Sequence, residues 1–383
     1  MAKHNAANER IKREYFRYLK EALGRDQATV DGIAKALARF EETTGAKEFK
    51  RFHREQAVAF KKRLAEAQNA RTGERLAKAT LLSTLRDLKA FFFWLANQPG
   101  YQSHIAYDDA AYFNLSDKDV AIARARREKA VPTLVQVHHV LAAMPASTVL
   151  ERRDRALIAF AALTAARVGA LASLRLQHVN TAEGFVDQDA RTVDTKFSKS
   201  FRTYFMPVGG EALAIVHAWL EELRRDHLWG PADPLFPATR MGLNDAGSFA
   251  PLGLARHGWA TTTPIRDIFR RAFTAAGLPY FNPHSFRDML VHHAMKLSLS
   301  PEEMKAWSQN LGHADVLTTF TSYGQVSTHR QGELLRRQVR ELEAPPIDDL
   351  DILELIKRIR SRRESHPRLP DWHYAHDTAK ALE

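Results

Sequence analysis

The 383-residue sequence contains no cysteine. This absence excludes disulfide scaffolds, thiolate zinc sites, iron–sulfur clusters and cysteine nucleophiles, and it is typical of a reducing compartment. Long hydrophobic runs are missing too: the longest, Ala156 to Ala166, is far shorter than the roughly 20 residues of a membrane-spanning helix. Residues 1–15 alternate polar and charged side chains without the apolar core of a secretory signal. We therefore expect a cytoplasmic protein.

Charge is unevenly distributed along the chain. Residues 1–130 hold 26 Lys or Arg against 17 Asp or Glu, a net +9, whereas residues 131–383 hold 30 against 28, a net +2; together they give the formal +11. A basic surface either aids solubility or attracts a polyanion, because each neutralised phosphate releases condensed counterions. The hydrophobic share of 45% and the length predict two or three globular domains.

Helical periodicity covers most of residues 10–100. Thr29 is the expected cap of one helix, and the aromatic run Phe91 to Trp94 lies at helical spacing, which favours a packed core over a base-stacking platform. We predict a helical, DNA-binding domain over residues 1–114 and a basic interdomain linker over 115–132. The linker is either a solvated connector or a strap along a nucleic-acid backbone. The basic residues expected to contact such a backbone are Arg124, Arg126, Arg127 and, further along the chain, Lys199.

The second predicted domain, residues 133–344, is also mainly α. Thr133 and Gln136 have capping-box spacing, and short β-forming segments between residues 185 and 208 predict one small antiparallel sheet among helices. After Pro345 and Pro346, apolar residues spaced by three or four predict an amphipathic helix near residues 347–363. Residues 345–383 therefore either pack on their own domain or dock on a neighbouring protomer.

Five motifs in the second domain could carry chemistry. Taken singly each has an ordinary explanation: an arginine in an apolar helical stretch can be a structural ion pair, a lysine on a hairpin can be a solvated turn residue, and a lone tyrosine is usually a core aromatic. A His and an Arg three residues apart at a helix start share one face, so both can point at one anion. In chain order the motifs are centred on Arg167, Lys196 with Lys199 as its alternative, His284 with Arg287, His313 after Leu311–Gly312, and Tyr323.

Taken together and in this order, the motifs resemble those of the tyrosine recombinases, or phage integrase family. The resemblance covers about residues 133–328 by motif and residues 10–110 more loosely. It implies a helical core-binding domain followed by a mostly helical catalytic domain. Three departures are visible: Ala170 stands where the family has an acidic residue, Asp288 replaces a usual His, and ten residues instead of nine separate His313 from Tyr323.

The resemblance also implies the reaction and the roles in it. DNA strands are cleaved and rejoined through a 3′-phosphotyrosyl bond to Tyr323, without metal, ATP or other cofactor. Arg167 and Arg287 would hold the phosphate, because a guanidinium binds two oxygens at once. Lys196 is the expected general acid, with Lys199 as the runner-up, and His284 and His313 would position or accept protons.

The expected partner is double-stranded DNA, bound by a protein that is monomeric when free and forms a homotetramer with a Holliday junction during recombination of a mobile element. Partner recombinases or a DNA-bending protein are further candidates, and the location would be the nucleoid. Two other functions stay open: relaxation of DNA in the manner of a type IB topoisomerase, and an inactive DNA-binding accessory factor. A metal-dependent nuclease is disfavoured, because few carboxylates cluster near the histidine motifs and the histidines lack His-Glu-x-x-His spacing.

Overall fold

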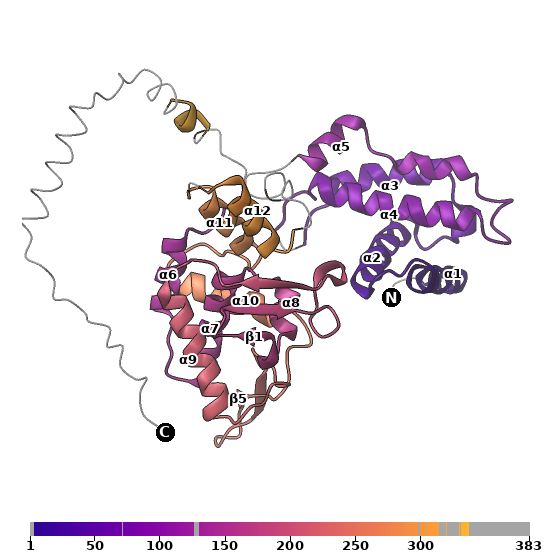
Figure 1. The fold of residues 1–383 in the computed structure, drawn as a ribbon. Helices are drawn as coiled ribbons and strands as arrows, with labels where there is room; N and C mark the ends of the chain where they lie inside the picture. The colour runs from indigo at the N-terminus through magenta and orange to yellow at the C-terminus, as the bar shows by residue number, and fades with distance from the viewer. Residues whose placement is uncertain are drawn as a thin grey trace, which may run out of the picture. The chain divides into compact units, whose positions relative to one another are not determined.

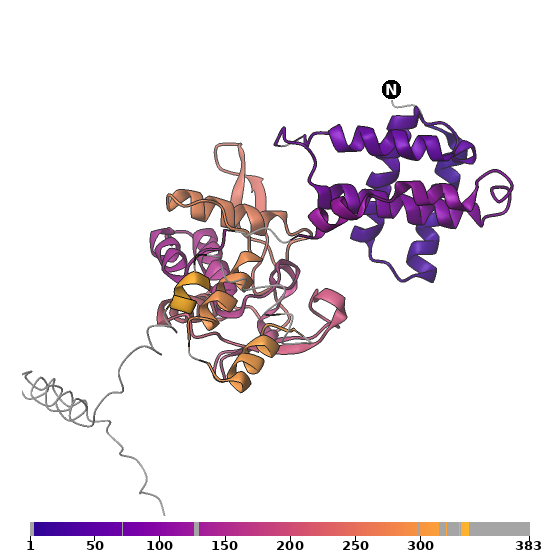
Figure 2. The same ribbon diagram turned by 90° about the horizontal axis from the view of Figure 1, so that it is seen from above.

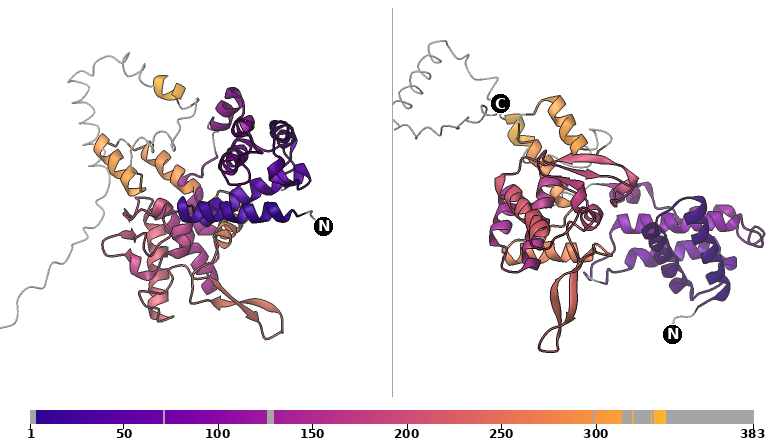
Figure 3. Two further views of the ribbon diagram at one scale, coloured as in Figure 1. Left: turned by 90° about the vertical axis from the view of Figure 1, so that its right-hand side faces the viewer. Right: turned by 60° about the horizontal axis from the view of Figure 1, so that its bottom comes forward.

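The computed structural model describes residues 4–70, 72–125, 130–297, 299–313 and 331–336, together with Thr319 and His329. The chain divides into two compact units, residues 1–127 and 128–383. Figure 1, Figure 2 and Figure 3 draw the elements of each unit from several directions. The described part is mainly helical with small antiparallel sheets, as predicted from the sequence. None of the described helices is both long enough and apolar enough to cross a lipid bilayer.

The regular elements of unit 1 are helices within its described residues, which also contain one isolated β-bridge between Gln68 and Arg75. The first helix is α1 and it continues into a single π-helical turn. The cap of α2 is Asp26 and not the predicted Thr29: an Asp26 carboxylate oxygen accepts a hydrogen bond from the Thr29 backbone N–H at 2.7 Å. Gly45 then ends α2 in the left-handed conformation. The helices are α1 (Ala6–Arg17), α2 (Gln27–Thr44), α3 (Arg54–Glu66), α4 (Lys78–Ala96) and α5 (Asp117–Arg124).

Aromatic rings form much of the core of unit 1. Phe91 and Phe92 in α4 are fully buried, which confirms the prediction of a packed core for these two residues. The Phe92 ring stacks on Phe52 with centroids 3.8 Å apart and meets Phe40 edge to face at 5.2 Å. α4 therefore joins α2 and the segment before α3 through one cluster of rings.

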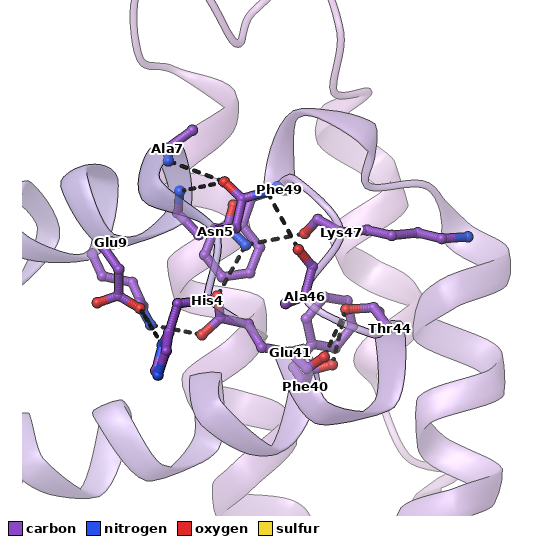
Figure 4. Close-up of polar contacts among 12 residues, drawn as sticks. His4, Asn5, Ala7, Glu9, Phe40, Glu41, Thr44, Ala46, Lys47 and Phe49 are labelled. Carbon is purple, nitrogen blue, oxygen red and sulfur yellow. Dashed lines mark hydrogen bonds and ion pairs between the residues drawn. The ribbon is translucent and has the colours of Figure 1, made fainter. Parts of the chain in front are cut away.

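A buried side-chain amide joins α1 to the end of α2 and the residues that follow it. Asn8 in α1 donates hydrogen bonds to a Glu41 carboxylate oxygen and to the Lys47 carbonyl, and its side-chain oxygen accepts one from the Phe49 N–H. Figure 4 labels these three partners. Lys12 also donates to the same carboxylate at 2.6 Å. The satisfied amide therefore fixes α1 against the end of α2.

α5 lies inside the segment that the sequence predicted to be a linker. It packs on α4, and its Asp119 forms an ion pair with Lys78 at 2.8 Å. Arg124 is exposed in the last turn of α5, whereas Arg126 and Arg127 lie outside the described residues.

Unit 2 is built around α7, whose residues from Ala156 to Thr164 are all buried. The predicted capping box of Thr133 with Gln136 is present at the start of α6, and Ser300 caps α12 in the same way. The helices are α6 (Leu134–Ala143), α7 (Val149–Thr164), α8 (Val168–Ser173), α9 (Gly210–Arg225), α10 (Thr263–Ala275), α11 (Ser285–Ala294) and α12 (Pro301–Asn310).

Two antiparallel sheets lie among these helices. The first has the order β1-β2-β3, with Val186 paired to Val179 on one side and to Thr203 on the other. It confirms the predicted small sheet. The second, a two-stranded ribbon, was missed, although an Asn244 to Ser248 turn joins its strands; Figure 3 shows it projecting from its unit. The strands are β1 (Val179–Asn180), β2 (Phe185–Gln188), β3 (Phe201–Tyr204), β4 (Thr239–Leu243) and β5 (Phe249–Leu254).

Candidate active site

Arg167 stands at a sharp turn between α7 and α8. The Thr164 hydroxyl donates a hydrogen bond to the Phe160 carbonyl at 2.7 Å and accepts one from the Ala166 N–H, which closes the end of α7. Ala165 takes a left-handed conformation with φ of 47°, and Arg167 is extended just before α8 begins. Its side chain is half-buried and makes no hydrogen bond or ion pair within the described residues. The turn therefore presents a guanidinium that can receive an anion.

Arg287 is the most deeply placed charge of the site. It lies in the first turn of α11 with 2% of its surface exposed. One guanidinium nitrogen donates to the Ala165 carbonyl at 2.9 Å, and another donates to the Leu311 carbonyl and lies 3.3 Å from Nε2 of His313. The guanidinium thus connects the turn before Arg167 to the loop that carries His313. The two carbonyl oxygens are neutral and do not cancel its positive charge.

His313 continues this hydrogen-bonded chain into the protein. Its Nδ1 lies 2.9 Å from the Thr319 hydroxyl oxygen, and that hydroxyl donates to Ser308 Oγ at 2.7 Å. Because the arginine can only donate, Nε2 of His313 must accept. Nδ1 therefore carries the proton and donates it to Thr319, so every bond in the chain has a consistent direction. Sequence reasoning missed Ser308 and Thr319, since a lone hydroxyl residue carries no signal before its partner is known.

The surroundings keep the His313 imidazole neutral. Burial, together with the positive charges of Arg287, Arg167 and His284, lowers the pKa of His313 from its usual 6.5 to about 4. The positive charges that contribute to this lower pKa belong to three other predicted site residues. At neutral pH the imidazole is therefore an acceptor at Nε2.

Asn310 fixes the His313 loop to the first sheet. Its side-chain amide accepts a hydrogen bond from the Tyr204 backbone N–H at 2.6 Å and donates one to the Tyr204 carbonyl at 2.9 Å. The backbone carbonyl of Asn310 accepts a hydrogen bond from the Thr203 hydroxyl. Gly312 takes φ of 70°, and a Cβ there would lie 2.7 Å from the Phe201 ring. The strand β3 therefore determines where His313 stands, and the glycine of the motif is required by this close approach.

The remaining predicted residues fall into two groups. Lys196 and Lys199 are exposed on the connection between β2 and β3, where the sequence analysis expected a hairpin lysine. His284 is exposed immediately before α11, and the predicted helix start there is correct. Tyr323 and the C-terminal segment 345–383 lie outside the described residues, so the structure does not place them. The roles of all these residues stay predictions.

Two further features of the site concern its support and its metal-binding capacity. Ala170, at the position where the resemblance expects an acid, is buried and supplies no charged partner for Arg167. Across the described ranges, no three His, Asp or Glu side chains gather in a way that could hold a metal ion.

Comparison with known proteins gives related sequences over much of the chain. Tyrosine recombinase XerD of Pseudomonas aeruginosa is 27% identical over 209 residues, which are 54% of this chain and 58% of that protein. Tyrosine recombinase XerC of Xylella fastidiosa is 25% identical over 262 residues, 68% of this chain and 74% of that protein. The chain thus matches little more than half the length of the first of these relatives.

Solved structures share the fold. A lambda integrase (75–356) dimer bound to a COC′ core site aligns with a TM-score of 0.56 at 15% identity, over 84% of this chain and 96% of the other. A lambda integrase tetramer bound to a Holliday junction gives 0.55 at 15% identity, covering 84% and 81%. The profile of the phage integrase family matches residues 132–330, which are more than half of the 383 residues. The chain therefore belongs to the phage integrase family, the tyrosine recombinases.

Proposed function

We propose that this protein is a site-specific DNA recombinase that cleaves and rejoins strands through a 3′-phosphotyrosyl intermediate. The observation that carries the proposal is the convergence of Arg167, Arg287 and His313 from three separate parts of unit 2. Arg287 contacts both the turn before Arg167 and the His313 loop. A cluster of two guanidiniums and a neutral imidazole suits the charge of a phosphodiester.

The two arginines would stabilise the charge that develops on the non-bridging oxygens. Each donor of this kind contributes roughly 3–4 kcal/mol, or about 10²–10³ in rate, by analogy with oxyanion-hole groups. Arg167 has a side chain without a hydrogen bond to any described residue, so it can bind a phosphate oxygen without breaking one. Arg287 would share its donors between the protein carbonyls and the phosphate.

The covalent step would run from the phenol to the 5′-oxygen. The Tyr323 oxygen attacks phosphorus, the bond from phosphorus to the 5′-oxygen breaks, and the phenol proton passes to a site histidine. Lys196, with Lys199 as the alternative, gives its proton to the departing 5′-oxygen, which becomes a hydroxyl. The phosphotyrosyl ester then replaces the broken phosphodiester, and attack by a 5′-hydroxyl reverses the step. The scheme needs neither ATP nor a metal ion.

DNA would be the partner in this reaction, contacted by the basic residues Arg124, Arg126, Arg127 and Lys199. The lambda integrase neighbours were solved as a dimer on a core site and a tetramer on a Holliday junction. By that likeness we propose four copies on two duplexes, formed by a protein that is a monomer in free solution. Residues 345–383 would either pack on their own domain or dock on a neighbouring copy. Partner recombinases or a DNA-bending protein would join where the site requires them.

A nicked suicide substrate tests this function directly. The DNA should carry the end sequences of the genetic element that encodes the protein, with the nick placed so that the cleaved fragment diffuses away. We expect an adduct that survives SDS, forms in EDTA and disappears in Tyr323→Phe. Tyr280→Phe, at a partly exposed tyrosine of the same unit, is the matched control and should keep the adduct.

Two other outcomes of DNA assays would indicate a different function. Relaxation of supercoiled DNA without joined recombinant products would indicate topoisomerase-like activity, and DNA binding without any adduct would indicate an accessory factor.

A further inference from the structure

The connection between β2 and β3, residues 189–200, carries Lys196 and is fastened to the protein just before that lysine. Val193 belongs to the core of unit 2 with 3% of its surface exposed. On either side of it, the Thr192 hydroxyl accepts a hydrogen bond from the His178 ring, and the Asp194 N–H donates one to the Ser173 hydroxyl. Three consecutive residues are thus held, and Lys196 follows two positions later.

The nearest of these attachments is Ser173, the last residue of α8. Its hydroxyl accepts a hydrogen bond from the Asp194 N–H at 2.8 Å and donates to the Gly169 carbonyl at 3.1 Å. Gly169 itself touches the same place, because a Cβ built there would lie 3.3 Å from the Asp194 carbonyl oxygen. The backbone before Lys196 therefore rests along α8, the helix that begins directly after Arg167.

His178, directly before β1, makes the second attachment. Its Nδ1 accepts a hydrogen bond from the Arg175 N–H at 2.9 Å, so its Nε2 carries the proton and donates to the Thr192 hydroxyl at 3.0 Å. This bond holds the connection where it leaves β2. Ser173 is thus the attachment closer to the lysine and the one that reaches the Arg167 helix.

We propose that Ser173 is a positioning residue that keeps Lys196 in register with the phosphate held by Arg167. The inference rests on the proposed function, in which Lys196 gives a proton to the departing 5′-oxygen. Such a transfer needs donor and acceptor within about 2.6–3.2 Å, and displacements near 1 Å cost about 100-fold in rate. Lys196 follows Asp194 by two positions, so the position of this backbone limits where its ammonium group can reach. Ser173 acts through the connection and touches no reacting atom.

The test compares two suicide substrates that differ in one atom, the 5′-bridging oxygen or a sulfur in its place. A thiol has a pKa near 8.5, so sulfur leaves as a thiolate and needs no proton donor, whereas an alkoxide does. We expect Ser173→Ala to slow cleavage of the oxygen substrate about 10- to 100-fold and to cleave the sulfur substrate at the wild-type rate, with unchanged DNA binding. Ser173→Thr, which keeps the hydroxyl, should restore cleavage of the oxygen substrate.

Thr148→Ala is the control for lost stability. It removes a side-chain hydrogen bond of similar length at the far end of α7, and it should leave the ratio of the two rates unchanged. Equal slowing of both substrates by Ser173→Ala, or no slowing of either, would overturn the inference.

Lys196→Ala separates this outcome from failure of the underlying function. Rescue of Lys196→Ala by sulfur, without a sulfur-specific effect in Ser173→Ala, rejects the positioning role alone. Absence of rescue in Lys196→Ala rejects the lysine as the acid and the inference with it. Absence of an adduct in the wild type rejects the recombinase itself.

Discussion

The two units bury very different amounts of polar material. Among the described residues of unit 1, the buried polar side chains are Asn8 and Thr84, and its core is dominated by phenylalanine rings. Unit 2 packs alanine, leucine and valine around α7 and buries far more polar groups. Its buried polar and charged residues are Arg153, Thr164, His178, Gln188, Thr203, Ser285, Arg287, Ser308, His313 and Thr319.

This difference shows that the interior of unit 2 contains hydrogen-bonded polar groups, whereas the interior of unit 1 is almost wholly apolar. A buried polar group costs about 1–3 kcal/mol unless it is hydrogen-bonded, so a surplus is retained only where each group finds partners. In unit 2 many of these partners are one another or main-chain carbonyls near the candidate site. The candidate site of unit 2 therefore rests on a buried polar network, from Arg287 through His313 to Thr319, that has no counterpart among the described residues of unit 1.

The largest effect on stability is expected in the aromatic core. Phe92→Ala removes a fully buried ring that contacts several others, and it should lower the free energy of unfolding of unit 1 by about 3–5 kcal/mol. Hydrogen exchange followed by mass spectrometry should show faster exchange in residues 4–125 and little change in unit 2. Phe249→Ala, at a ring that is 71% exposed on β5, should change stability by less than about 0.5 kcal/mol. A uniform increase of exchange in both units would contradict this separation.

Substitution of the two arginines should affect the stability of the protein differently, although we expect both substitutions to impair cleavage. Arg287→Ala leaves the buried Ala165 and Leu311 carbonyls without a donor and should cost about 2–3 kcal/mol of unfolding free energy. Arg167→Ala breaks no hydrogen bond within the described residues and should cost less than about 0.5 kcal/mol. Each should reduce adduct formation by about 100-fold or more. Urea unfolding measures the first difference, and equal destabilisation by the two variants would refute the structural role of Arg287.

The neutral imidazole predicts a pH dependence of stability. Because the folded-state pKa of His313 is about 4 and the unfolded value is near 6.5, the unfolded chain binds more protons between these limits. Stability therefore falls as pH drops from 6.5 to 4, and this residue contributes a loss of about 2 kcal/mol between pH 7 and pH 5. Urea unfolding of the wild type and His313→Asn at both pH values isolates that share. Burial also lowers the pKa of His178 and His293, which adds a loss of the same sign to both proteins.

The sequence contained the motifs of the site but not the contacts that assemble it. Arg167, Arg287 and His313 could be found because their residue types and order are distinctive. Ser173 and Asn310 could not, because a hydroxyl or an amide becomes a support only when a remote backbone group, such as that of Asp194 or Tyr204, is brought to it. Long-range pairing of this kind has no periodic signal.

The fold shows the same limit of prediction: local helix signals could be recognised in the sequence, whereas one small sheet could not. The predicted start of α6 at Thr133 and Gln136 is correct, because a capping box is a local sequence signal. The β4–β5 ribbon was missed because its exposed apolar strands lack the alternation expected of a half-buried sheet.

The smallest effect concerns the turn that joins the two arginines. Ala165 adopts φ of 47° and ψ of 31°, a left-handed conformation that costs a non-glycine residue about 1–2 kcal/mol. Ala165→Gly relieves this strain but makes the unfolded chain more flexible, by about 0.4–1 kcal/mol. The net result should be a gain of about 0.5 kcal/mol in thermal or urea unfolding, with the Arg287 hydrogen bond to this carbonyl retained. Ala162→Gly, inside α7, should instead destabilise by about 1 kcal/mol. Destabilisation by both substitutions would contradict this prediction, because it would mean that the added flexibility of the unfolded chain outweighs the strain relieved at Ala165.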